Sequence, residues 1–122
     1  MNAVAAIAAA GILLAAPLKV TLTAPTHTPK IGAKWPYVVH ATRGGRPAAA
    51  RITVQIVDPL GTAHAVEFGA NKKHVTNWPF KGVFRDYVIW PRSSLGVPLT
   101  FRVIVVVGAT KKVINYKVTS HA

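Results

Sequence analysis

After Pro17, apolar and polar residues alternate in short runs that proline or glycine interrupts. The clearest run is residues 51–58 (RITVQIVD), in which every second position from Ile52 to Ile56 is a branched apolar residue. This two-residue period is typical of a half-buried β-strand, and no helical periodicity is found after residue 17. The sequence therefore predicts one all-β domain over residues 17–122.

Six or seven strands are expected in this domain. They cover residues 18–24, 35–43, 51–58, 65–68, 83–90, 99–107 and 111–119. Residues 69–79 are expected to form a long connection, and the last two strands a hairpin that turns at residues 108–110. Strands at this spacing, separated by turn residues, are typical of a β-sandwich.

Each of the three tryptophans directly precedes a proline, at Trp35, Trp78 and Trp90. A residue before proline is driven to extended backbone, and proline cannot donate a hydrogen bond to a sheet. Each pair is therefore expected to mark the start or end of a strand, with the indole closing one end of the core. The alternative is a rim of exposed indoles on which a ligand stacks.

Four segments carry a resemblance to a known class of domain. They are the proline-rich loop APTHTPKIG, the strand and turn RITVQIVDPLG, the strand FRDYVIWP, and the final hairpin that begins GVPLTFRV and ends YKV. With these segments, residues 17–122 resemble a bacterial extracellular immunoglobulin-like β-sandwich. The resemblance implies an antiparallel sandwich of about seven strands without catalytic residues, and a role in adhesion, spacing or partner binding at the cell envelope.

The N-terminal residues 3–16 form an unbroken run of apolar or small residues without charge. Fourteen residues are too few to span a bilayer, which takes about twenty, but they match the core of a secretory signal peptide. No basic residue precedes the run, and Leu14 is large for a cleavage site after Ala16. We therefore assign residues 1–16 to a signal peptide or membrane-anchor segment of an exported protein. A membrane tether through residues 3–16 and an Ala-rich helix packed on the domain remain alternatives.

The mature domain is strongly basic. Lysine and arginine number 15 against three acids, Asp58, Glu67 and Asp86, which gives a net charge of +12. This charge predicts attraction to polyanions such as wall polymers, anionic lipid headgroups or nucleic acid. Nucleic acid is not favoured, because the basic residues are scattered and no run of five or more exists. The alternative is that the charge serves solubility alone.

Basic residues in or beside turns are the candidate site for an anionic partner. These residues are Lys72, Lys73, His74, Lys111, Lys112, Arg43 and Arg46. If they converge in the fold, an anionic partner would bind there with an affinity that falls as the salt concentration rises. The alternative is a solvated surface without a partner.

Catalytic and metal chemistry find little support in the sequence. The chain has no cysteine, its three acids lie on different segments, and Ser93, Ser94 and Ser120 lie outside any nucleophile motif. Loops could still gather His27, His64 and His74 around a metal, although a copper(I) site would want sulfur ligands. We predict a non-enzymatic module without metal or cofactor that acts in structure or protein interaction at the envelope. The alternatives are a module that binds anions or carbohydrate, and a periplasmic metal-binding protein.

Overall fold

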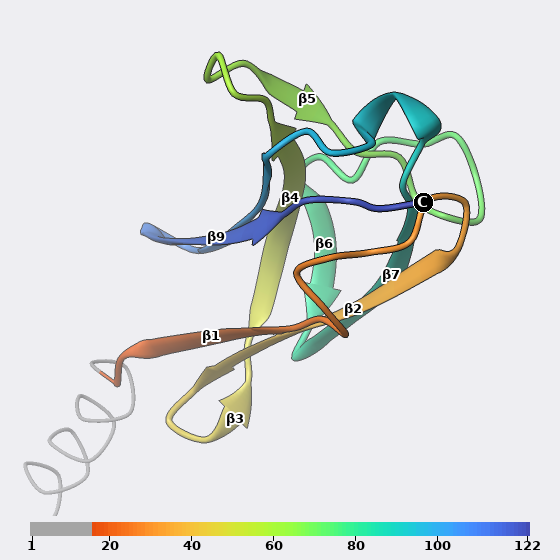
Figure 1. Ribbon diagram of the computed structural model, residues 1–122. Helices are drawn as coiled ribbons and strands as arrows, with labels where there is room; N and C mark the ends of the chain where they lie inside the picture. The colour runs from red at the N-terminus through yellow and green to blue at the C-terminus, as the bar shows by residue number, and fades with distance from the viewer. Residues whose placement is uncertain (1–15) are drawn as a thin grey trace, which may run out of the picture.

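The computed structural model describes residues 16–122, which form nine β-strands in two antiparallel sheets (Figure 1). The first sheet contains β1 (Leu18–Thr23), β2 (Lys34–Arg43), β3 (Arg46–Pro47) and β7 (Val83–Ile89). The second contains β4 (Ala49–Val57), β5 (Ala63–Ala65), β6 (Trp78–Lys81), β8 (Leu99–Val107) and β9 (Thr110–Val118). The predicted all-β class is thus confirmed, with more strands than expected.

Helical structure in the described part of the chain is limited to one short 3₁₀ turn, η1 (Arg92–Ser94). Among residues 16–122 no helix has the length and hydropathy needed to cross a bilayer. The segment assigned to a signal peptide or anchor lies, apart from Ala16, outside the described residues.

Strand β2 is the centre of the first sheet. It pairs with β1 along one edge and with β7 along the other, and the short β3 continues the second edge where Arg43 pairs with Arg46. In the second sheet β4 and β8 are central, β9 pairs with β8, and β5 and β6 share the free edge of β4. Long strands therefore form the middle of each sheet, the short β3, β5 and β6 extend one edge, and the long β9 forms the other edge of the second sheet.

The chain passes from one sheet to the other at Ala48, at Gly82 and between β7 and β8. Gly82 donates a hydrogen bond from its N to Ala48 O at 3.0 Å and accepts one from Ala41 N at 2.8 Å. Its φ is +75°, and a Cβ at this position would lie 2.7 Å from Cβ of Pro47. A glycine is therefore required where β6 crosses to β7.

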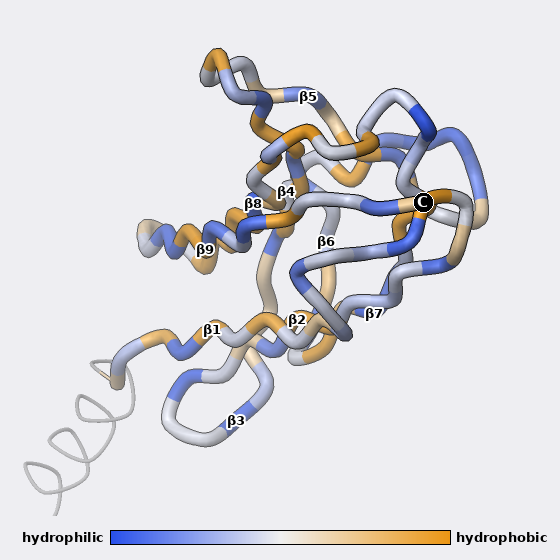
Figure 2. The backbone as a smooth tube through the Cα atoms, in the orientation of Figure 1, coloured by the Kyte–Doolittle hydropathy of each residue, from blue (hydrophilic) through white to orange (hydrophobic). Residues whose placement is uncertain are grey.

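The core lies between the two sheets. Figure 2 shows hydrophobic and hydrophilic residues alternating along β1, β2 and β9, as the two-residue period of a strand requires. Residues of both sheets form one buried cluster, including Val39 on β2, Val54 on β4 and Val103 on β8. The hydrophobic effect of this shared core holds the two sheets together.

Aromatic rings close one end of the core. Trp35 makes edge-to-face contacts with Trp90 and Phe101, with ring centroids 5.4 Å and 5.0 Å apart. Trp35 is 2% exposed and Trp90 0%. The prediction that the indoles close the core is confirmed for Trp35 and Trp90, which are too buried for a ligand-stacking rim, whereas Trp78 on β6 is half-buried against Phe68.

Three short strands differ from the prediction. β3 lies in a predicted turn, β6 begins within the connection predicted over residues 69–79, and β5 shares only Ala65 with the strand predicted over residues 65–68. All three residues of β5 are exposed, so no alternation of burial marks it in the sequence. β6 carries Pro79 in its middle, which a sheet accepts only at an edge or bulge, so its pairing with β4 depends on the tertiary fold.

The two buried indoles differ in their hydrogen bonding, which yields a paired prediction. Trp35 Nε1 donates to Thr26 O at 2.9 Å, whereas Trp90 Nε1 is buried without a partner among the described residues. Replacing each by phenylalanine removes the same atoms, but only Trp35→Phe breaks a hydrogen bond. We expect Trp35→Phe to lower the free energy of unfolding by about 1–2 kcal/mol more than Trp90→Phe, measured by urea denaturation. An equal or larger loss for Trp90→Phe would contradict this assignment.

Candidate functional site

Four of the predicted basic residues come together at one end of the sandwich. Arg43 and Arg46 pair across β2 and β3, and Lys111 and Lys112 lie at the start of β9. Arg43 Nη2 donates to Thr110 Oγ1 at 3.1 Å, which joins the turn of the first sheet to the turn between β8 and β9 of the second. The tertiary fold therefore gathers residues that lie about 65 positions apart in the chain.

Lys19 lies at the same end and was not identified from the sequence. It is exposed on β1 and, with Lys112, lines a groove of about 490 Å³ between β1 and β9. An isolated lysine in a strand carries no local signal, and only the approach of β1 to β9 reveals its position. We call Lys19, Arg43, Arg46, Lys111 and Lys112 the basic end.

The charge of the basic end is not compensated by acids. Within residues 16–122, no lysine or arginine nitrogen lies within 4.0 Å of a carboxylate oxygen. Arg43 Nε is buried and has no hydrogen-bond partner in this part of the chain. Asp58 follows the opposite end of β4, roughly 30 Å away at the usual rise of a strand. The positive potential of the basic end therefore extends into solvent.

The remaining predicted residues, Lys72, Lys73 and His74, do not join the basic end. They are exposed in the loop between β5 and β6, where Phe68 N donates to Lys73 O at 2.8 Å. Figure 1 shows this loop on the opposite side of the molecule from the turn between β8 and β9. The structure thus divides the predicted site into two separate basic surfaces.

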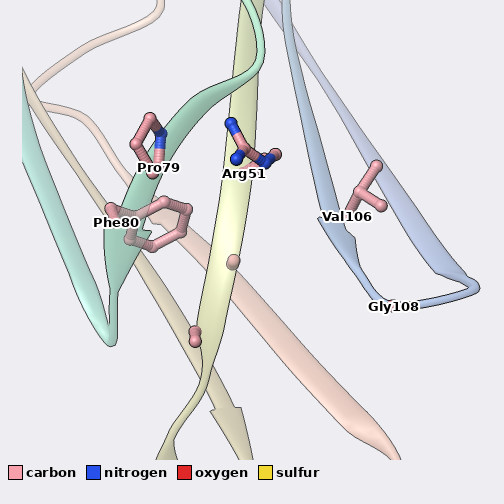
Figure 3. A pocket seen from close by; sticks show the side chains of 7 residues that line it. Arg51, Pro79, Phe80, Val106 and Gly108 are labelled. Carbon is pink, nitrogen blue, oxygen red and sulfur yellow. The ribbon is translucent and has the colours of Figure 1, made fainter.

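A shallow hollow adjoins the basic end. It has a volume of about 600 Å³ and lies over the first half of β4, between β6 and the end of β8. Figure 3 shows Arg51 on β4 between Pro79 and Phe80 on one side and Val106 on the other. Arg51 Nη1 donates to Asn77 O at 3.0 Å. The hollow therefore combines apolar walls with one cation, and its β6 wall was missed because that segment was expected to be a loop.

Asp58 organises the turn at the other end of the sandwich. Its Oδ1 accepts hydrogen bonds from Leu60 N at 2.9 Å and Thr62 N at 3.0 Å, and its Oδ2 lies 2.8 Å from His64 Nε2. The hydrogen bond from His64, followed by the backbone bond from Thr62, holds the pKa of Asp58 below its ordinary value. These contacts stabilise the turn between β4 and β5.

Other polar groups that could serve chemistry are engaged in structural contacts. Ser94 Oγ and Ser120 Oγ lie 2.9 Å apart, and each also donates to a backbone carbonyl. Burial, and then the charge of Asp86, raises the pKa of the Tyr37 hydroxyl well above its usual range. These groups join segments of the fold that are distant in sequence.

The histidines considered as metal ligands lie apart. His27 stacks on Tyr116 with ring centroids 3.9 Å apart, and its Nδ1 lies 2.6 Å from Lys117 O. His64 contacts Asp58 at the other end of β4, and His74 lies in the loop before β6. Over residues 16–122 no three histidine, aspartate or glutamate side chains are grouped closely enough to hold a metal ion.

The fold and the basic end define an all-β protein of two packed antiparallel sheets with a charged surface at one end. No family model and no curated protein matches the sequence. Among solved structures, the chain is similar to Spo0M, a sporulation control protein from Bacillus subtilis, with a TM-score of 0.53 and 13% identity. The match covers 86% of this chain and 49% of that one, so this chain spans about half the length of Spo0M. At this identity the likeness shows the fold alone.

The contact between Asp58 and His64 predicts a pH-dependent stability. Because the pKa of Asp58 in the folded protein lies below 3.8, its ionised form stabilises the fold above that pH, and this contribution is lost as the pH falls through the lowered pKa. We expect Asp58→Asn to lower Tm slightly near neutral pH, with a difference from the native protein that narrows below pH 3.8. Thermal unfolding followed by circular dichroism across this range measures it. His64→Asn removes the same contact from the other side, so its Tm difference from the native protein should narrow in the same way. A Tm difference that stays constant with pH would contradict the assignment.

Proposed function

We propose that the protein is a non-catalytic module of the immunoglobulin-like type that works at the cell envelope after export. Its central strands support this assignment, since β1–β2–β7 in one sheet faces β4–β8–β9 in the other. In chain order these are the pairings A–B–E and C–F–G of an immunoglobulin-like sandwich. This fold is compatible with structural and with binding roles, so the residues exposed on its surface must distinguish between them.

The basic end is the observation that supports a binding role. Five cations from β1, β2, β3 and β9 converge there without a neighbouring acid, which is the arrangement that attracts a polyanion. Carbohydrate binding by stacking is less favoured, because Trp35 and Trp90 are buried. The proposed partner is therefore an anionic component of the cell surface.

Charge-reversal variants test the binding role. The triple variant Arg46→Glu, Lys111→Glu, Lys112→Glu changes the basic end, and Lys30→Glu, Lys72→Glu, Lys73→Glu makes the same charge change at exposed sites elsewhere. We expect the native protein to bind immobilised polyphosphate at low salt and to elute as salt rises. The basic-end variant should elute at a clearly lower salt concentration than the control variant. If both variants elute at the same lowered salt concentration, net charge alone accounts for binding. If the native protein is not retained at low salt, the binding role is rejected.

Export is tested by the intact mass of the protein in each fraction of its native host. A mass that lacks about the first 16 to 24 residues, found outside the cytoplasm, is the expected result for a cleaved signal peptide. A full-length mass in the membrane fraction would instead indicate an anchor. A full-length mass in the cytosol would overturn the export proposal.

A further inference from the structure

The described chain begins at the basic end. Ala16 and Pro17 line a hollow of about 400 Å³ together with Lys19 and the turn between β2 and β3. Pro17 also lines the groove that Lys112 borders. The uncharged apolar run of residues 3–16 therefore joins the domain where its unpaired cations gather.

The spacing between the apolar run and Lys19 is comparable to the thickness of the headgroup layer of a bilayer. Lys19 is three residues from Ala16, which an extended chain covers in about 10 Å. The headgroup layer on each side of a bilayer is roughly 5–8 Å thick, so with Ala16 at the edge of the hydrocarbon Lys19 would lie at the outer surface of the headgroups. A soluble polyanion offers charge alone, whereas an anionic bilayer offers both an apolar phase and charge at this separation.

The apolar run and the basic end would also add to each other's membrane affinity. An uncharged run of fourteen residues is short for a spanning segment, and stable anchoring by a weak apolar element usually takes a second, electrostatic signal. Lysine and arginine beside an anionic leaflet supply such a signal over about one Debye length. Asp58, at the far end of β4, lies beyond this range.

We infer that the basic end is a docking surface for an anionic lipid bilayer in the chain that retains residues 3–16. The domain stands on the membrane with the β2–β3 and β8–β9 turns against the headgroups and the β4–β5 turn pointing away. This inference rests on the proposed function and names the anionic partner of the same surface.

Single labels measure the orientation directly, because the chain contains no cysteine. Ala109→Cys places a fluorophore in the β8–β9 turn, and Leu60→Cys places one in the β4–β5 turn, where Leu60 is 93% exposed. Both full-length variants are mixed with phosphatidylglycerol vesicles that carry a headgroup nitroxide quencher. Strong quenching at position 109 with little at position 60 is expected. Equal quenching, or stronger quenching at position 60, would overturn the orientation.

Binding to vesicles tests the electrostatic component. The variant Arg46→Glu, Lys111→Glu, Lys112→Glu, made in the full chain, should bind phosphatidylglycerol vesicles at least about tenfold more weakly than the native chain. The control Lys30→Glu, Lys72→Glu, Lys73→Glu should change binding by less than about threefold. Equal binding of the native chain to phosphatidylglycerol and phosphatidylcholine vesicles would overturn the inference.

The polyphosphate assay separates this inference from the proposed function. Salt-dependent retention on polyphosphate, without a preference for anionic vesicles, would assign the basic end to a soluble polymer and reject the bilayer. Loss of both activities would reject the bilayer and the binding role together.

Discussion

The edge-to-face contact of Trp35 with Trp90 and Phe101 is the interaction on which the rest of the structure depends. Trp35 belongs to the first sheet and Phe101 to the second, so these rings fix how β2 faces β8. In a chain without disulfides, such large buried rings contribute much of the cohesion between the sheets. At the opposite end, where β1 begins, smaller buried side chains such as Leu18 and Ala41 fill the core.

At that opposite end the sheets are joined by a polar contact. Arg43 reaches from β2 to Thr110 in the second sheet, and its aliphatic stem is partly buried while its charge has no acid nearby. A cation held in this way costs stability unless solvent or an anionic partner approaches it. The same side chain thus takes part in the architecture and in the candidate binding surface, and links the packing of the sheets to the proposed function.

The distribution of charge follows from the topology. Turns of both sheets meet where β1 begins, and each turn brings its own lysine or arginine. The acids serve other tasks: Asp58 organises the β4–β5 turn, and Asp86 accepts hydrogen bonds from Gly69 and Tyr37. Glu67 lies in the connection between β5 and β6, beside His74, and no described carboxylate lies within 4.0 Å of a lysine or arginine nitrogen. The resulting polarity gives the domain one surface suited to an anionic partner.

The sequence by itself determined the all-β class, the long strands and the burial of two tryptophans, because a two-residue period and Trp–Pro pairs act over a few neighbouring positions. It also determined the excess of positive charge. Only the tertiary structure decided where that charge gathers: it joined Arg43 to the β8–β9 turn, added Lys19, and separated Lys72 and Lys73. Short β3, β5 and β6 likewise depended on the edges offered by longer strands. Contacts between distant segments arise from the packing of two sheets, which no local pattern encodes.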